Sequence, residues 1–288
     1  VDEGPWPDPE NTEPGYIIDA SGRPTSVLPG GAYIDSSLSF ALMRGGHIDC
    51  TVLGALEELC AMDENAKALL PQKPVTILFD IKAGPAALFT FGPEKCSMRE
   101  GRGACDIRLP FSSYEKFNAM ISGTFTPIPS KGFTKIGFLT KRFMKMTDIL
   151  SAYLKADEKA LENPLFFDRS TELMLYVIGG AIAQIGNHDR IGRFSASNIT
   201  DGTVMLSIHD GPGVSVIVKD HCLRAVKKRL PEPRAVMEFE SIRLARRLFD
   251  GKENAMDCIG KKKIAISGMI SMLDNINRIL DRVSVYLA

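Results

Sequence analysis

The chain has 288 residues, of which 35 are basic and 35 are acidic, and its hydrophobic fraction is 44%. This length predicts about two domains, and the composition is that of an ordinary globular protein. Because the charges cancel, the chain as a whole has no field that would attract nucleic acid or a membrane surface, and we expect no nucleic-acid partner.

The local sequence disfavours further classes of protein. The longest apolar run, LMLYVIGGAIA at 173–183, is shorter than the roughly 20 residues of a membrane-spanning helix. The first fourteen residues are acidic and rich in Pro, so they do not have the pattern of a signal peptide. The six cysteines, at positions 50, 60, 96, 105, 222 and 258, lack the spacing of metal ligands. We expect no metal site and small, buried cysteines in a reducing, cytoplasmic setting.

The first part of the chain contains one long motif. Residues 4–57 include LPGG at 28–31, SFALMRGGHID at 39–49 and VLGA at 52–55. This pattern resembles the middle of the beta subunit of family I coenzyme A transferases. The resemblance implies an α/β segment from an enzyme in which a Glu carboxylate attacks a thioester.

The catalytic Glu of that family lies in a Ser-Glu-Asn-Gly motif, a few residues before a Gly-Pro that here is Gly4-Pro5. The motif would therefore fall before Val1, and Glu3, which no Asn-Gly follows, does not replace it. We expect residues 1–57 to be a truncated transferase-like segment without catalytic residues. His47 is expected to be structural, with its ring bonded to a neighbouring carbonyl.

The rest of the chain repeats one pattern twice. Gly123 pairs with Gly251 and Gly132 pairs with Gly260 at one common spacing, and Gly-Pro turns at 84–85 and 211–212 follow the same order. The repeat predicts one domain at 58–157 and a second at 165–288. The charged stretch 155–168, which contains Pro164, is the expected linker.

Each copy is expected to fold as an α+β unit. A helix opens it at 55–70 or at 170–185, where Ser170 or Thr171 is the expected cap. A short helix that ends at Gly123 or Gly251, a Gly-centred strand and a closing amphipathic helix finish the unit. The pattern predicts an antiparallel sheet of about five strands backed by helices. The expected strands are VTILFDI, AALFTF and CDIRL in the first copy, and TVMLSI, VSVIV and AVMEF in the second.

The clearest part of the repeat is SIRLARRLFDGKENAMDCIGKKKIAISG at 241–268. It resembles the sterol carrier protein type 2 domain, and residues 105–138 resemble it less closely. The resemblance implies an apolar tunnel for a sterol, a fatty acid or fatty acyl-CoA, enclosed by helices. The candidate lining residues are Phe117, Met120, Ile121, Phe143, Met146, Ile149, Leu150, Leu244, Leu248, Phe249, Leu273, Ile276 and Leu280.

The same residues also have a simpler interpretation. Apolar stripes at helical spacing are typical of a solid core. A basic cluster could contact an anionic ligand but could equally form a solvated face; it consists of Arg224, Lys227, Lys228, Arg229 and Arg234, with Arg243, Arg246 and Arg247 on the next helix. Three functions stay open: a lipid carrier without catalytic activity, a 3-oxoacid-type CoA transferase subunit whose catalytic Glu lies upstream, and a scaffold that binds no ligand. No cofactor is expected apart from CoA or acyl-CoA as a ligand, and a homodimer stays open as the assembly.

Overall fold

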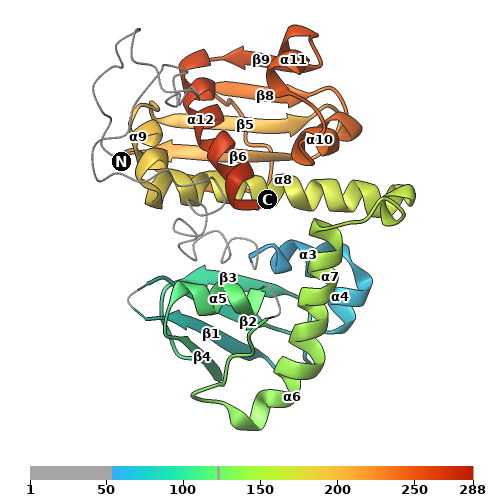
Figure 1. The fold of residues 1–288 in the computed structure, drawn as a ribbon, viewed down its shortest axis with the longest axis vertical. Helices are drawn as coiled ribbons and strands as arrows, with labels where there is room; N and C mark the ends of the chain where they lie inside the picture. The colour runs from blue at the N-terminus through green and yellow to red at the C-terminus, as the bar shows by residue number, and fades with distance from the viewer. Residues whose placement is uncertain (1–53, 83, 122–123, 288) are drawn as a thin grey trace, which may run out of the picture. The chain divides into compact units, whose positions relative to one another are not determined.

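Figure 1 presents the computed structural model, which describes residues 54–82, 84–121 and 124–287. The predicted transferase-like segment, with His47, therefore lies almost entirely outside the described residues. Among the helices that are described, none combines the length and the apolar character required to cross a bilayer.

The first half of the described chain forms a four-stranded sheet and several short helices. Its strands lie in the order β3-β2-β1-β4, and β4 runs parallel to β1, whereas the other neighbours are antiparallel. The elements are α3 (Leu56–Met62), α4 (Glu64–Ala68), β1 (Val75–Ile81), β2 (Ala86–Phe91), β3 (Cys96–Glu100), β4 (Ile107–Phe111), α5 (Tyr114–Ile121), the 3-10 turn η1 (Phe133–Lys135), α6 (Ile136–Phe138), the π-helical turn η2 (Leu139–Phe143) and α7 (Met144–Leu154).

The second half forms a five-stranded sheet in the order β7-β6-β5-β8-β9, in which β8 runs parallel to β5. Its elements are the 3-10 turn η3 (Ala160–Glu162), α8 (Pro164–His188), α9 (Arg190–Ser197), β5 (Gly202–Ile208), β6 (Gly213–Lys219), β7 (Cys222–Val226), β8 (Ala235–Phe239), α10 (Ile242–Phe249), α11 (Ala255–Gly260), β9 (Ile264–Gly268) and α12 (Ile270–Leu287). The α+β class is therefore confirmed.

Each sheet is mixed instead of purely antiparallel as predicted. The sequence also failed to indicate β3 and β7, the outer strands next to β2 and β6, because CSMRE and CLRAV mix polar and apolar residues. After β3 in the first sheet the chain crosses to the far side of β1, and after β7 in the second sheet it crosses to the far side of β5. The returning strand, β4 or β8, then points the same way as β1 or β5.

The two sheets differ at one edge. The second sheet ends with β9, whereas the corresponding place in the first has only an isolated bridge between Arg108 and Lys131. Gly132 and Gly268 both have a positive φ, of 92° and 84°. A Cβ at Gly132 would collide with the carbonyl of Asp106, the residue just before β4, and a Cβ at Gly268 would collide with that of Arg234, the residue just before β8. Gly132 thus corresponds to Gly268. The predicted pairing with Gly260 is wrong, because α11 lies before the final strand in the second half.

Helix α8 begins earlier than predicted. The Asn163 side chain accepts a hydrogen bond from the Phe166 N–H, and Pro164 occupies the first turn, where its missing donor has no cost. Ser170 is therefore no cap: it lies inside α8, and its buried hydroxyl donates to the Tyr153 carbonyl. Because α8 starts at Pro164, the expected linker at 155–168 is only partly a linker.

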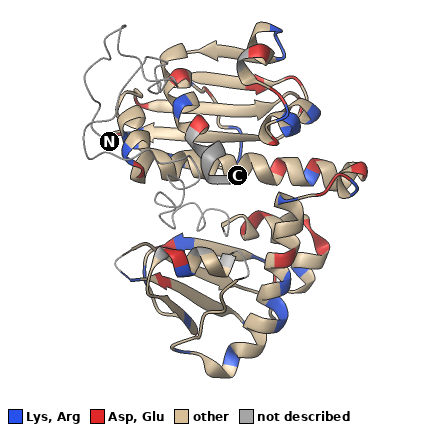
Figure 2. Cartoon of the chain, viewed as in Figure 1, with Lys and Arg blue, Asp and Glu red and all other residues tan. Residues whose placement is uncertain are grey.

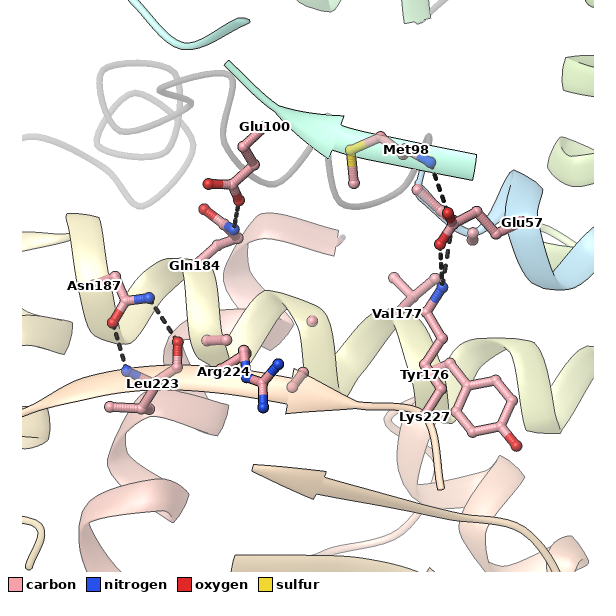
Figure 3. A pocket seen from close by; sticks show the side chains of 15 residues that line it. Glu57, Met98, Glu100, Tyr176, Val177, Gln184, Asn187, Leu223, Arg224 and Lys227 are labelled. Carbon is pink, nitrogen blue, oxygen red and sulfur yellow. Dashed lines mark hydrogen bonds and ion pairs between the residues drawn. The ribbon is translucent and has the colours of Figure 1, made fainter. Parts of the chain in front are cut away.

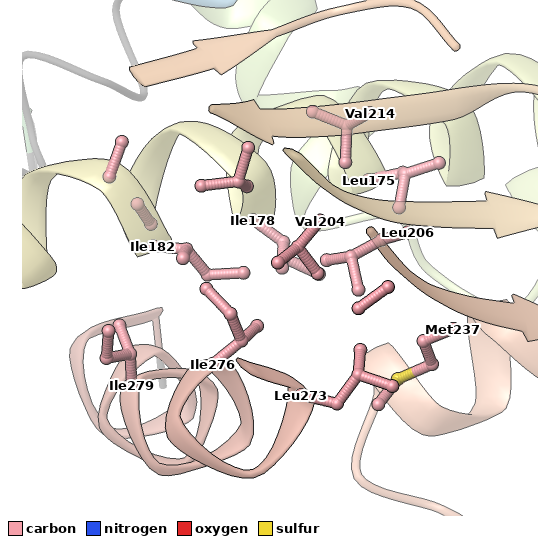
Figure 4. Close-up of a cluster of buried hydrophobic side chains, with 14 of the residues drawn as sticks. Leu175, Ile178, Ile182, Val204, Leu206, Val214, Met237, Leu273, Ile276 and Ile279 are labelled. Carbon is pink, nitrogen blue, oxygen red and sulfur yellow. The ribbon is translucent and has the colours of Figure 1, made fainter. Parts of the chain in front are cut away.

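Two hydrophobic cores underlie the sheets, and α8 contributes to both. Leu173 and Val177 belong to the first core, in which the rings of Phe79 and Phe117 meet edge to face at 6.1 Å. The second core lies between α8, α12 and one face of β5, β6 and β8, and Figure 4 shows its side chains pointing toward one another. Its labelled members are Leu175, Ile178, Ile182, Val204, Leu206, Val214, Met237, Leu273, Ile276 and Ile279.

Candidate functional site

The side chains predicted to line a tunnel lie in these two cores. Buried in the first core are Phe117, Phe143, Met146 and Leu150, with Met120 and Ile149 partly buried against it. Buried in the second are Leu244, Leu273 and Ile276, with Leu248, Phe249 and Leu280 partly buried against it. Ile121 ends α5, and its side chain is not among those that the structure describes. None of the others lines the pocket described below, so their contact with a ligand stays a prediction.

The three candidate arginines on α10 have different surroundings. Arg246 is buried, with a side chain that is 5% exposed, and its guanidinium donates to Asp250 at 2.9 Å and to the Ser170 hydroxyl at 2.6 Å. Arg247 is exposed and pairs with Glu253 at 3.0 Å, and Arg243 is exposed as well. Of the three, only Arg243 and Arg247 are placed where a soluble anion could reach them.

A pocket of about 490 Å³ lies beside α8. Figure 3 shows α8 running between β3 and β7, the two strands that the sequence did not indicate. The volume of the pocket falls in the range of about 300 to 1,000 Å³ that is usual for sites of small ligands. The pocket is lined by Gly54, Ala55, Glu57, Met98, Glu100, Tyr176, Val177, Gly180, Ala183, Gln184, Asn187, Leu223, Arg224, Ala225 and Lys227.

Apolar groups form most of the wall. On α8 the lining positions recur at helical spacing, so that Val177, Gly180 and Ala183 share one face with small or branched side chains. Leu223 and Ala225 on β7 and Met98 on β3 face the same space. The small residues leave room beside the helix, because no long side chain fills the space over this face.

One end of the pocket holds amide groups. The Asn187 amide nitrogen donates to the Leu223 carbonyl at 2.8 Å, and its oxygen accepts from the Leu223 N–H at 2.7 Å. These bonds satisfy the N–H and the carbonyl of Leu223 on the free edge of β7, which would otherwise need water as their hydrogen-bond partner. Nearby, Gln184 donates to Glu100 at 2.6 Å. Both amides lie on the same face of α8 as the apolar wall.

The other end is charged. The Lys227 ammonium lies 3.5 Å from a carboxylate oxygen of Glu57 and 3.3 Å from one of Glu58, and it reaches the Gly54 carbonyl at 3.4 Å. The other carboxylate oxygen of Glu57 accepts from the Met98 N–H at 2.6 Å. Glu57 thereby joins α3 to β3, while Lys227 brings one cation to the rim.

Tyr176 lines the pocket as a neutral phenol. Burial raises the pKa of its hydroxyl well above the usual value, and the hydrogen bond that it donates to Glu172 at 2.7 Å adds to the shift. Tyr176 therefore stays protonated at neutral pH and can act as a hydrogen-bond donor but not as a base. Within the described residues, no group of three or more His, Cys, Asp or Glu side chains is arranged to hold a metal ion.

Of the lining residues, sequence reasoning singled out Arg224 and Lys227, as members of the basic cluster that could contact an anionic ligand. A further local signal was the pair of amides, Gln184 and Asn187, at the end of an otherwise apolar helix. Of the predicted small, buried cysteines, Cys60, Cys96 and Cys258 are buried, Cys105 is partly so, and Cys222 is exposed on β7 next to the pocket. The prediction for Cys222 was wrong, because an outer strand leaves its solvent side uncovered.

Comparison with known proteins relates short parts of the chain to CoA transferases. No family model matches. The beta subunit of the acetate CoA-transferase of Escherichia coli is 54% identical over 50 residues, which are 17% of this chain and 21% of that protein. One subunit of the probable succinyl-CoA:3-ketoacid coenzyme A transferase of Bacillus subtilis is 39% identical over 72 residues, which are 25% and 32% of the two chains. The chain thus spans about a fifth to a third of the length of these relatives.

Comparison with solved structures finds sterol carrier proteins. The crystal structure of sterol carrier protein 2 aligns with a TM-score of 0.31 and 17% identity, over 38% of this chain and 95% of that one. The sterol carrier protein domain 2 of Helicoverpa armigera aligns with a TM-score of 0.32 and 12% identity, over 38% and 88% of the two chains.

Proposed function

We propose that this protein is a lipid-binding carrier, which holds a sterol, a fatty acid or fatty acyl-CoA and has no catalytic activity of its own. The observation that carries the proposal is the pocket beside α8, with its mainly apolar wall and its charged end. The motif at 241–268 supports it independently, through its resemblance to the sterol carrier protein type 2 domain.

The wall of the pocket matches an amphipathic ligand. An acyl chain or a ring system placed along Val177, Gly180 and Ala183 would lose contact with water, which is the main favourable term in binding such molecules. The flexible thioether of Met98 can adapt to ligands of different shape.

The charged end would orient the ligand. Lys227 is held by two carboxylates at 3.3 and 3.5 Å, which are loose single contacts instead of a tight two-point pair. Its third donor reaches the Gly54 carbonyl at 3.4 Å, so a carboxylate or a phosphate at the rim would take the place of one of these three loose contacts. Arg224, which also lines the pocket, adds a second cation on β7.

Native mass spectrometry of the purified protein tests the proposal directly. We expect a co-purified lipid that a fluorescent fatty acid displaces. The variant Gly180→Leu should lose most of the bound lipid, because its side chain would project into the pocket. The helix itself should tolerate the change, since Leu has the better helix propensity.

The matched control is Gly260→Leu at the exposed end of α11, where a Cβ would meet nothing within 4 Å. This variant should keep the lipid. A wild-type protein with neither bound lipid nor displacement would refute the carrier proposal. Equal loss of lipid in the two variants would show that the pocket beside α8 is not the site where the lipid binds.

A second candidate function is CoA transfer, which the 54% identity to the Escherichia coli protein over 50 residues favours. An assay for transfer of CoA from an acyl-CoA to acetate separates the two candidates. The carrier proposal expects no turnover from the purified chain. Turnover that depends on the protein would show that the chain is an enzyme.

A further inference from the structure

Four large apolar side chains are exposed within a short segment after β4. Ile128 is 77% exposed, Phe133 61%, Ile136 36% and Met144 49%, in a chain whose other apolar side chains mostly fill the cores. They lie before η1, in η1, in α6 and at the first position of α7. Exposed apolar side chains that gather in one segment mark surfaces that contact a partner or a membrane.

The same segment is strongly basic. Residues 116–147 contain six Lys and Arg and no Asp or Glu, although the charges of the whole chain cancel. The zero net charge of the chain therefore does not describe this segment. Figure 2 shows blue positions on the chain beside α6 and at the start of α7.

Some of these cations are engaged in local contacts. Lys135 pairs with Asp106 at 2.7 Å, and its ammonium is the main cause that lowers the pKa of that carboxyl. Lys131 donates to the Cys105 carbonyl at 2.6 Å.

Lys141 and Lys145 remain available. They are four residues apart, on exposed helical positions beside Met144. No ion pair joins either of them to an acidic side chain of the described residues. Lys141 lies in the π-helical turn η2 and Lys145 in the first turn of α7, and π-helical turns are frequent at functional sites.

From this combination we infer that residues 128–145, the basic apolar segment, dock onto the surface of an anionic lipid membrane. Exposed aromatic and aliphatic side chains can enter the interface while lysines beside them meet anionic headgroups. A nucleic acid or an acidic protein would pair with the lysines but would give the Ile128 and Phe133 side chains no apolar surroundings. The membrane is therefore the partner that accounts for both features, and this surface does not include the pocket beside α8.

Co-sedimentation of the full chain with vesicles tests this inference. Vesicles of phosphatidylcholine with about one third phosphatidylserine should bind the protein, vesicles of phosphatidylcholine alone should bind it far less, and added salt should weaken binding. Lys141→Glu combined with Lys145→Glu should reduce binding by about tenfold or more, because two attractive charges become repulsive. Phe133→Ser should reduce it several-fold by removing an apolar contact.

Matched controls lie in the second half of the chain. Lys261→Glu with Lys262→Glu makes the same change of charge at two exposed lysines, and Phe194→Ser removes a Phe that is 69% exposed on α9. Both controls should bind the anionic vesicles like the wild type. Wild-type protein that stays in solution with these vesicles, or controls that lose as much as the test variants, would overturn the inference. Preferential binding to a DNA duplex or to polyglutamate would overturn it as well. Lipid retained in the purified variants reports on the carrier proposal separately.

Discussion

Two serines on neighbouring strands of the second sheet have the same burial but different partners. Ser207 on β5 and Ser215 on β6 are both 0% exposed. The Ser215 hydroxyl donates to the Lys228 carbonyl at 2.9 Å and accepts from the Leu230 N–H at 3.0 Å. Ser207 Oγ finds no hydrogen-bond partner in the described part of the chain. A buried hydroxyl without a partner costs free energy that a satisfied one does not.

The two alanine variants should therefore change stability in opposite directions. Ser207→Ala removes an unsatisfied group and should raise the free energy of unfolding by about 1 kcal/mol. Ser215→Ala removes two hydrogen bonds and leaves a backbone N–H unpaired, so it should lower that free energy by about 1 to 2 kcal/mol. Urea unfolding followed by circular dichroism measures both. A loss of stability in Ser207→Ala would mean that its hydroxyl is satisfied after all.

At the scale of elements, a chain of buried polar groups joins four helices. Arg246 on α10 donates to Ser170 on α8, which in turn donates to the carbonyl of Tyr153 on α7. The Tyr153 hydroxyl donates to Asp63 at 2.8 Å, and Asp63 caps α4 through the Ala66 N–H. Burial raises the Tyr153 pKa, and the bond to Asp63 adds to the shift, so this hydroxyl remains a donor at neutral pH. The connected groups fix how these helices pack.

Removing one or the other partner of the ion pair between Arg246 and Asp250 should change stability by different amounts. Asp250→Ala should lower the free energy of unfolding by about 3 kcal/mol, because it leaves the buried Arg246 charge without its counter-ion. Arg246→Met should cost less than half as much, because an apolar side chain of similar length fills the space and Ser170 keeps its bond to Tyr153. Guanidinium chloride unfolding compares the two variants. Equal losses would contradict this account of the pair.

At the scale of the whole molecule, α8 links the two cores. Leu173 and Val177 pack into the first core, while Leu175 and Ile178 pack into the second, so neither core is complete without this helix. All described residues belong to one compact unit. A shared helix should make the loss of one core destabilise the other.

We therefore expect both sheets to unfold in a single transition. Hydrogen exchange with mass spectrometry at increasing denaturant should give the same midpoint for peptides from β1 and from β5. Val177→Ala removes apolar volume only from the first core. It should move both midpoints together to lower denaturant, which corresponds to a loss of about 1 to 2 kcal/mol in the free energy of unfolding. Two separate midpoints, of which only that of β1 moves, would show that the halves unfold independently.

Local pattern was enough to predict several elements of this fold. VTILFDI, AALFTF and AVMEF coincide with β1, β2 and β8, and Gly251 ends the helix before it with a positive φ of 67°. These predictions succeed because hydrophobic alternation and a left-handed glycine act within a few residues. The same pattern missed β3 and β7, whose mixed side chains reflect their place at the outer side of β2 and β6.

The amino-acid order thus determined the α+β class, most central strands and the repeat of one sheet pattern. Only the tertiary structure decided that Arg246 is buried, that Gly132 corresponds to Gly268, and that a pocket lies beside α8. The contacts at that pocket join residues as far apart as Glu57 and Lys227 in the sequence. Such contacts depend on where whole helices and strands come together, and no periodicity within one segment encodes that.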